Sequence, residues 1–269
     1  MAAAQGFPVW YELMARDPAK VAPFYAAVLG WSFKTEGMDL PNGSNYRMIT
    51  RPDGSHAAGL LVLGEAMLAA GAQPNWAVYF HTPDVDAAAA KAAGMGATIH
   101  LEPHNLPAAG RLAMLADPQG AIFYLITPQM PEGTTDEDMQ SAVFSTEKTG
   151  YCTWNELNTD GADAQLAFYT GLFDWQQEGE MPMPGDHSYR FVLCGGEGIG
   201  AIGSMKPDGM PNAWLPYFRV RDITAVGQAI LAHGGQIVMG PHDVPGGDSI
   251  IVAIDPDGAA IGLVAKTEE

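Results

Sequence analysis

The stretch from Trp76 to Ala121 reads WAVYFHTPDVDAAAAKAAGMGATIHLEPHNLPAAGRLAMLADPQGA, and the chain repeats it. A shift of 138 positions carries this stretch without a gap onto Trp214–Ala259, and 14 of the 46 aligned positions are identical. Ordinary composition would give roughly three identities in such an alignment. The chain is therefore a tandem duplication, which makes this repeat the feature that decides the fold.

The duplication also covers the earlier part of each half. A shift of 144 positions brings Trp10–Leu13 onto Trp154–Leu157. A shift of 143 positions brings Tyr46-Arg47 onto Tyr189-Arg190. The change of shift by a few residues is what insertions in loops between the same structural elements produce.

The two copies are separated by a segment of different character. Thr127–Gly150 holds two prolines and the acidic run Asp136-Glu137-Asp138, and it shows no sustained hydrophobic periodicity. Such a segment is typical of an exposed connector. We therefore expect one domain over residues 1–133, a connector over 134–149 and a second domain over 150–269.

Each copy contains the same series of elements twice. Val9–Ala15 is a short apolar run that predicts a strand, and Asp17-Pro18 has the form of a helix N-cap followed by proline. Apolar residues then recur at helical spacing up to Gly30, which predicts the helix end. Three extended pieces follow, around residues 32–36, 46–50 and 57–63. The unit is β-α-β-β-β.

The second series starts at Trp76–His81, which predicts a strand, and continues with Asp84 as the cap of an alanine-rich helix over Val85–Ala93. Further strands are expected at residues 98–101, 111–116 and 121–126, with a turn at Asp117-Pro118-Gln119-Gly120. The whole chain therefore holds four β-α-β-β-β modules, an α+β fold.

The composition limits the partners of the protein. With 13 basic and 31 acidic residues the formal net charge is -18, which disfavours nucleic acid and an anionic membrane surface. Cys152 and Cys194 provide no disulfide framework, and no apolar run reaches the length of a membrane span. The first ten residues lack the pattern of a signal peptide. We expect a cytoplasmic monomer or homodimer with a small-molecule ligand.

The order of these motifs resembles the vicinal-oxygen-chelate superfamily, which contains glyoxalases, bleomycin-resistance proteins and extradiol dioxygenases. The resemblance lies in the Phe24-Tyr25 helix, the Asp84-Val85-Asp86 helix start and the Asp117-Pro118-Gln119-Gly120 turn, all three repeated in the second copy. It implies a tandem pair of glyoxalase-like domains. In each domain, two modules would form one curved mixed sheet around an open funnel.

The resemblance also identifies the positions where metal-dependent members carry two histidines and a glutamate. In the first copy these positions hold Trp10, Trp76 (or Ala77) and Tyr124. In the second copy they hold Trp154, Trp214 and Gly262. None of these residues can replace a histidine or carboxylate ligand. We therefore expect no cofactor and no bound metal of the family type.

Candidate ligand-binding residues follow from strand alternation. Trp10 and Glu12 lie two apart and share a face, as do Trp154 and Glu156, and the family analogy directs that face into the funnel. A carboxylate there needs a basic or hydroxyl partner, and we expect Arg47 and Arg190. A structural ion pair beneath a tryptophan is an equally good reading of these residues.

Aromatic residues complete the candidate site. Trp76, Trp214 and Tyr124 would replace the metal centre with a flat apolar surface, although aromatic side chains more often belong to a core. Trp76 and Tyr79 lie three apart, as do Trp214 and Tyr217, so one of each pair should pack under a helix. His104 and its repeat His242 suit either acid–base chemistry or a backbone hydrogen bond in a loop.

Three functions remain open from the sequence. The first is a metal-free small-molecule-binding protein of the bleomycin-resistance type, which would take an apolar or aromatic ligand. The second is a glyoxalase-like lyase, isomerase or dioxygenase with an altered active site, with Glu12 or Glu156 as a base. The third is a structural role, in which both funnels are filled by their own side chains. The sequence does not decide whether the protein is an enzyme.

Overall fold

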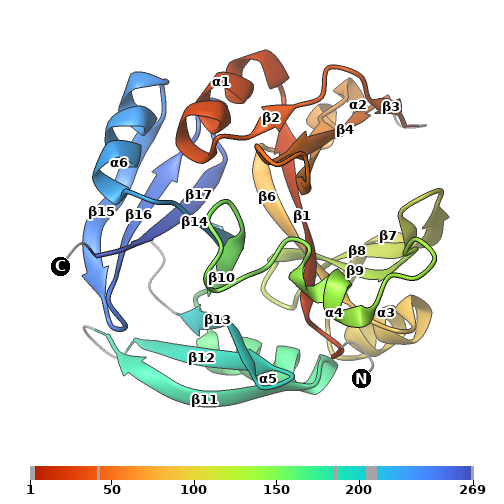
Figure 1. The fold of residues 1–269 in the computed structure, drawn as a ribbon. Helices are drawn as coiled ribbons and strands as arrows, with labels where there is room; N and C mark the ends of the chain where they lie inside the picture. The colour runs from red at the N-terminus through yellow and green to blue at the C-terminus, as the bar shows by residue number, and fades with distance from the viewer. Residues whose placement is uncertain (1–3, 41–42, 184–186, 204–210, 268–269) are drawn as a thin grey trace. The chain divides into compact units, whose positions relative to one another are not determined.

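The computed structural model describes residues 4–40, 43–183, 187–203 and 211–267. These residues form two mixed β-sheets with a few helices, which confirms the α+β class (Figure 1). The first half contains strands β1 (Pro8–Ala15), β2 (Ser32–Phe33), β3 (Met38–Asp39), β4 (Asn45–Thr50), β5 (His56–Val62), β6 (Asn75–His81), β7 (Thr98–Leu106), β8 (Gly110–Ala116) and β9 (Ile122–Pro128), and helices α1 (Pro18–Leu29), α2 (Glu65–Ala69), α3 (Val85–Gly94) and α4 (Asp136–Ser141).

Among the described residues, the second half repeats the order of the longer elements, without counterparts of β3, α2 and α4. It contains strands β10 (Cys152–Asn158), β11 (Trp175–Pro182), β12 (Ser188–Cys194), β13 (Glu197–Gly203), β14 (Ala213–Arg219), β15 (Gln236–Val244), β16 (Asp248–Ile254) and β17 (Ala260–Lys266), and helices α5 (Ala162–Leu172) and α6 (Ile223–Ala232). None of the helices among the described residues combines the length and apolarity needed to cross a membrane.

The two sheets have the same strand order. The first runs β2-β4-β5-β1-β6-β9-β8-β7, with β3 beside β4, and the second runs β11-β12-β13-β10-β14-β17-β16-β15. In both sheets the first strand of each module pairs parallel with the last, and the hairpins within a module are antiparallel. The predicted tandem β-α-β-β-β arrangement is therefore confirmed. We number the modules 1 (β1–β5), 2 (β6–β9), 3 (β10–β13) and 4 (β14–β17).

Tertiary packing groups these modules differently from the sheets. The chain divides into two compact units. Unit 1 contains residues 1–10, 77–142 and 154–215, and unit 2 contains residues 11–76, 143–153 and 216–269. Unit 1 therefore combines modules 2 and 3, and unit 2 combines modules 1 and 4. Each unit draws on both halves of the duplicated sequence.

The helix ends follow the local sequence. The carboxylate of Asp17 accepts a hydrogen bond from the backbone N–H of Ala19, and Pro18 occupies the first helical position of α1. Gly30 closes the helix in the left-handed region with φ 70°, a conformation that favours glycine. Asp84 caps α3 through the N–H of Ala87. These predicted starts and stops are confirmed.

Unit 2 is held together by a buried chain of hydrogen bonds. The indole N–H of Trp76 donates to the hydroxyl of Tyr25 at 3.0 Å, and this hydroxyl donates to Oδ2 of Asp255 at 3.0 Å. Oδ1 of Asp255 accepts hydrogen bonds from the backbone N–H groups of Asp257 and Gly258 in its own Asp-Pro-Asp-Gly turn and from Ala259 directly after it. Burial and the nearby charge of Asp255 raise the pKa of Tyr25 well above its ordinary value, so the hydroxyl stays neutral and donates.

Unit 1 contains the same buried chain of hydrogen bonds, built from the corresponding residues. We call each of these Trp–Tyr–Asp chains a lock. Trp214 donates to the hydroxyl of Tyr169 at 3.0 Å, and Tyr169 donates to Oδ2 of Asp117 at 3.0 Å. In both units the tyrosine and the aspartate come from different halves of the sequence. The Asp-Pro-x-Gly turn therefore has two tasks, because one carboxylate oxygen shapes the turn while the other binds the tyrosine.

Aromatic rings surround each lock. In unit 2, the ring of Phe218 packs against Trp31 and Trp76 with centroids 5.0 Å apart in both cases. In unit 1, Phe80 lies 5.3 Å from Trp175 and 5.4 Å from Trp214. Edge-to-face and tilted pairs of this kind stabilise a core beyond the effect of area burial alone.

The connector is only partly exposed, so the expectation of an exposed segment was wrong in part. Thr135 and Asp138 form a capping box that starts helix α4, and Met139 on this helix is buried. Val143 and Phe144 are also buried, and Phe144 forms a β-bridge with Cys152. The burial of these apolar residues could not be predicted from the sequence, because a helix of six residues and a single β-bridge are too short to produce a recognisable hydrophobic periodicity.

We predict that Tyr25→Phe lowers the free energy of unfolding by about 1–3 kcal/mol, because it leaves the Trp76 indole and the Asp255 carboxylate without their shared partner in the core. Tyr169→Phe should have a similar effect. The measurement is chemical denaturation followed by circular dichroism.

Tyr151→Phe is the matched control for this experiment. The Tyr151 ring lies 3.5 Å from the guanidinium carbon of Arg51, a contact that phenylalanine preserves. This variant should change the stability by less than about 0.5 kcal/mol. Equal losses in Tyr25→Phe and Tyr151→Phe would contradict the assignment of the lock.

Candidate functional site

Strand β10 presents one open face. Along the strand, Trp154, Glu156 and Asn158 are partly exposed, and the residues between them are buried. This alternation is what a strand with one face on the core produces, since side chains point to opposite sides with period two. Trp154 and Glu156 therefore share a face, as the sequence predicts.

The neighbouring strands of the second sheet complete this surface. Strand β13 lies beside β10, and β12 lies beside β13 (Figure 1). The register pairs Glu156 with Ala201 and Phe191 with Ala201. The next row pairs Asn158 with Gly203 and Tyr189 with Gly203. We call the surface formed by Trp154, Glu156, Asn158, Tyr189, Phe191 and Gly203 the Glu156 face, and all of its residues belong to unit 1.

A chain of hydrogen bonds orders the polar groups of the Glu156 face. The indole N–H of Trp154 donates to the Tyr189 hydroxyl at 2.8 Å, and this hydroxyl donates to Oε2 of Glu156 at 2.8 Å. The side-chain amide of Asn158 donates to Oε1 at 2.7 Å. Both carboxylate oxygens of Glu156 thus accept hydrogen bonds.

Aromatic rings form the remainder of the face. The centroid of Phe191 lies 6.0 Å from that of Trp154 and 5.9 Å from that of Tyr189, both in edge-to-face geometry. The position of a Cβ on Gly203 would lie 2.8 Å from the Tyr189 ring, so glycine allows the tyrosine to lie over the strand. The arrangement places a carboxylate among three aromatic side chains.

The corresponding surface of the first half is closed. Glu12 is 2% exposed, and along β1 only Trp10 is partly exposed. The residue row beyond Glu12 pairs Met14 with Leu61, both buried, where the second half has Asn158 and Gly203. The two copies keep the glutamate and differ in what surrounds it.

Tyr46 occupies the position in the first half that Tyr189 occupies in the second. Glu12 pairs in register with Gly59, and a Cβ on Gly59 would overlap the hydroxyl of Tyr46. The tyrosine hydroxyl therefore lies over the backbone position next to Glu12. The sequence repeat contains Tyr46-Arg47 and Tyr189-Arg190 together, and the residue of each pair that reaches the glutamate face is the tyrosine.

The expected arginine partners of the glutamates were therefore wrong. Arg190 forms an ion pair with Asp163 on α5 at 2.6 Å and lies 3.8 Å from Glu180 on β11. Arg47 donates to Asn45 on its own strand at 2.7 Å. Because adjacent residues of a strand point to opposite sides, the tyrosines on one face exclude the arginines from it.

The remaining candidate residues lie in different surroundings. Trp76 and Trp214 are buried in the aromatic cores of their units, bonded to Tyr25 and Tyr169. Tyr124 stacks on Tyr79 with parallel rings, 4.1 Å between centroids and 4° between planes. The expectation that one aromatic residue of each pair three apart packs in a helix-covered core is confirmed for Trp76 and Trp214.

The residues at the metal-ligand positions of the family do not fit a metal ion. Indole and phenol side chains stand at five of the six positions, and at the sixth a Cβ on Gly262 would overlap the ring of Tyr217. Within residues 4–40, 43–183, 187–203 and 211–267, no group of three His, Cys, Asp or Glu side chains is arranged to hold a metal.

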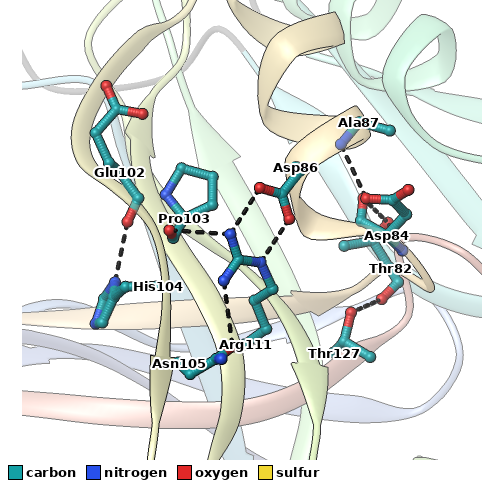
Figure 2. A network of polar contacts seen from close by, with 10 residues as sticks. All are labelled: Thr82, Asp84, Asp86, Ala87, Glu102, Pro103, His104, Asn105, Arg111 and Thr127. Carbon is teal, nitrogen blue, oxygen red and sulfur yellow. Dashed lines mark hydrogen bonds and ion pairs between the residues drawn. The ribbon is translucent and has the colours of Figure 1, made fainter.

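The two repeated histidines lie outside the Glu156 face. His104 is half-buried, and its Nδ1 pairs with the backbone carbonyl of Glu102 at 3.0 Å (Figure 2). His242 borders a cavity of module 4 in unit 2. The backbone hydrogen bond expected as one alternative is confirmed for His104, but the expected loop position was wrong, because His104 lies on strand β7.

Family comparisons match both halves of the chain. The Glyoxalase/Bleomycin resistance protein/Dioxygenase superfamily matches residues 150–263, and a glyoxalase-like domain matches residues 10–126. Together the two matches leave mainly the connector and the chain ends uncovered.

Curated relatives match along nearly the whole length. A putative glyoxylase, CFP32, of Mycobacterium bovis is 29% identical over 97% of this chain and 95% of its own. An anthracycline biosynthesis protein, DnrV, of Streptomyces peucetius is 27% identical over 98% of this chain and 95% of its own.

Solved structures share the fold at low sequence identity. The Mn(II)-bound glyoxalase from Novosphingobium aromaticivorans has a TM-score of 0.64 at 15% identity, covering 99% of this chain and 84% of that one. The homoprotocatechuate 2,3-dioxygenase of Brevibacterium fuscum, in complex with 3,4-dihydroxyphenylacetate, has a TM-score of 0.66 at 16% identity, covering 99% and 82%.

The position of Tyr46 can be tested with a pair of glycine variants. Gly59→Ala should lower the free energy of unfolding by about 1–3 kcal/mol, because the added methyl group displaces the Tyr46 hydroxyl from a packed strand surface. Gly94→Ala, in helix α3 where a Cβ meets nothing within 4 Å, should be neutral or stabilising by up to about 1 kcal/mol. Thermal and urea denaturation measure both, and a Gly59→Ala protein as stable as the parent would show that Tyr46 lies elsewhere.

Proposed function

Since the chain belongs to the glyoxalase/bleomycin resistance/dioxygenase superfamily, we propose that it binds a small organic molecule on the Glu156 face, without a transition metal. The single observation that carries this proposal is the partly exposed Glu156 carboxylate, ordered by Tyr189 and Asn158 and bordered by Trp154 and Phe191.

The polar part of this face selects one kind of ligand group. Glu156 accepts hydrogen bonds on both oxygens, and a carboxylate has lone pairs for about four. A ligand that donates an O–H or N–H group to the carboxylate, or that carries a positive charge, gains a charge-assisted hydrogen bond. A ligand carboxylate or phosphate would be repelled.

The apolar part of the face selects the shape of the ligand. Trp154, Tyr189 and Phe191 present ring surfaces around the carboxylate, and such surfaces bind flat apolar or aromatic molecules. The name of the Streptomyces relative places that protein in anthracycline biosynthesis. We therefore propose an aromatic compound with a hydroxyl or amino substituent as the ligand class.

The second half is the better candidate for this role. In the first half, Glu12 is 2% exposed and the adjacent row holds Met14 and Leu61. In the second half, Asn158 and Gly203 occupy that row, and the carboxylate is partly exposed. We propose that the second copy binds the ligand at this face, and that the corresponding residues of the first copy only stabilise the fold.

A second function has one supporting observation. The Tyr189 hydroxyl donates to Glu156, so a phenol and a carboxylate stand within proton-transfer distance on the same face. This pair would serve a lyase or isomerase reaction that moves a proton on the bound ligand. Ligand recovered unchanged after incubation in deuterated water supports binding alone, whereas exchange or conversion of the ligand supports the enzyme.

The expected surroundings of the protein follow from its charge and cysteines. The net charge of -18 favours a small ligand over nucleic acid or an anionic membrane. Cys152 and Cys194 are both free thiols and both buried, which suits a reducing compartment such as the cytoplasm. We propose a cytoplasmic monomer or homodimer.

The binding proposal predicts a specific loss in Glu156→Gln. A thermal-shift screen with hydroxylated and amino-substituted aromatic compounds should identify binders, and titration calorimetry then compares variants. We expect the affinity of Glu156→Gln to fall about tenfold or more, since a hydrogen bond to a charged group contributes about 1.5–3 kcal/mol.

Glu178→Gln is the matched control, because Glu178 is exposed on β11 and the substitution removes the same charge. Its affinity should equal that of the parent. Equal affinity of both variants would exclude the Glu156 face as the binding site. Binding that disappears with a chelator, together with a stoichiometric transition metal in the purified protein, would overturn the metal-free proposal.

A further inference from the structure

Module 4 contains a cavity that plays no part in the Glu156 face. It has a volume of about 710 Å³ and lies in unit 2, between the first turn of α6, strands β15 and β16 and the end of β17. The lining combines charged, hydroxyl and imidazole groups. Its residues are Asp222, Ile223, Thr224, Pro241, His242, Asp243, Ser249, Lys266 and Thr267.

The same place in module 2 is filled by an arginine. Arg111 on β8 donates through Nε and Nη2 to the two carboxylate oxygens of Asp86 at 2.5 and 2.6 Å (Figure 2). Nη2 also donates to the Pro103 carbonyl at 3.1 Å, and Nη1 donates to Asn105 at 3.2 Å. The planar guanidinium is thus held by three residues, and its hydrogen bonds to Asp86, helped by its charge, hold the pKa of that carboxyl group below the usual range.

We call this arrangement, in which a strand arginine pairs with an aspartate on the first turn of a helix, a clamp. Module 3 contains an equivalent clamp. Arg190 on β12 pairs with Asp163 on α5, and its register neighbour on β11 is Glu180. Asp163 and Asp86 are each the second residue of their helix. Module 1 has Arg47 on the corresponding strand, but Ala19 is the second residue of α1, and Arg47 bonds Asn45 instead. An arginine therefore stands on the strand before the last one in modules 1, 2 and 3, namely on β4, β8 and β12.

Module 4 departs from this pattern at three positions. The shift of 138 positions places Ser249 on Arg111, Thr224 on Asp86 and Asp243 on Asn105. The strand register is the same, because Asp243 pairs with Ser249 as Asn105 pairs with Arg111. Since Thr224, Asp243 and Ser249 all line the cavity, the cavity lies where module 2 holds its guanidinium.

The remaining groups favour a cation in this place. Asp243 introduces a carboxylate where module 2 has a neutral amide, and Pro241 recurs at the position of Pro103. Asp222 also borders the cavity, although one of its oxygens caps α6. The opposing charge is Lys266, whose side chain is largely exposed and already pairs with Asp248 at 3.4 Å.

We propose that this cavity binds a guanidinium group, either of a free guanidino compound or of an arginine side chain in a peptide. The carboxylate of Asp243 and the hydroxyls of Thr224 and Ser249 provide acceptors for a planar fork of N–H donors. A compact ammonium ion presents only a point charge and matches these dispersed acceptors less well. The proposal is independent of the ligand bound by the Glu156 face.

Titration with agmatine, followed by two-dimensional NMR of the full chain, tests the proposal. We expect saturable shifts at Thr224, His242, Asp243 and Ser249, with a dissociation constant on the order of 1 mM because the cavity is partly open to solvent. Cadaverine has a similar length and charge but no guanidinium, and it should bind about tenfold more weakly. The peptide acetyl-Gly-Arg-Gly-amide distinguishes an arginine in a chain from a free guanidino compound.

Three variants make the test specific. Ser249→Arg with Thr224→Asp rebuilds the clamp of module 2 and should abolish agmatine binding while the fold, checked by its NMR spectrum, is retained. Asp243→Asn should weaken binding about tenfold through the loss of one charged hydrogen bond. Glu137→Gln, on the exposed surface of α4, removes the same charge as Asp243→Asn and should leave binding unchanged.

Two results would overturn the proposal. The first is equal binding of agmatine and cadaverine, which would show that the cavity responds to charge alone. The second is undiminished agmatine binding in the rebuilt-clamp variant, which would place the ligand elsewhere. If the rebuilt variant does not fold, Asp243→Asn against Glu137→Gln decides the question with the same readout.

Discussion

The buried hydroxyl of a tyrosine that joins an indole N–H to the aspartate of a turn is the constraint on which both units depend. Tyr25 makes this connection in unit 2 and Tyr169 makes it in unit 1. A buried polar group must be paired, and here each partner satisfies the next. Because the tyrosine and aspartate of each lock come from different halves of the sequence, the duplicated halves pack as interleaved modules.

The fold could be predicted from the sequence because its signals are local. A repeat of 138 positions, helix caps such as Asp17 and Asp84, and the Asp-Pro-x-Gly turns each report on a few neighbouring residues. The same local signals do not predict that module 2 packs with module 3 and that module 1 packs with module 4. That pairing depends on which buried surfaces meet, and the hydrophobic pattern of a single module leaves its partner undetermined.

The candidate site could be predicted only in part, for a geometric reason. Trp154 and Glu156 share a face because they lie two apart on one strand, and no register is needed to see this. The partner of Glu156 lies on another strand, where Tyr189 and Arg190 are adjacent and point to opposite sides. A shift of one residue in the strand register would exchange the tyrosine and the arginine. Charge complementarity alone therefore led to the prediction of Arg190 as the partner. The actual register places Tyr189 beside the carboxylate and Arg190 on the opposite side.

The separation of the lock residues along the chain has a consequence for folding during synthesis. Tyr169 and Asp117 of unit 1 are 52 residues apart, whereas Tyr25 and Asp255 of unit 2 are 230 residues apart. Closing the longer loop costs more chain entropy, and Asp255 is synthesised 230 residues after Tyr25. Modules 2 and 3 can therefore associate while translation continues, but module 1 keeps its aromatic surface uncovered until module 4 is complete. Chaperone binding to a nascent chain should thus concentrate on module 1.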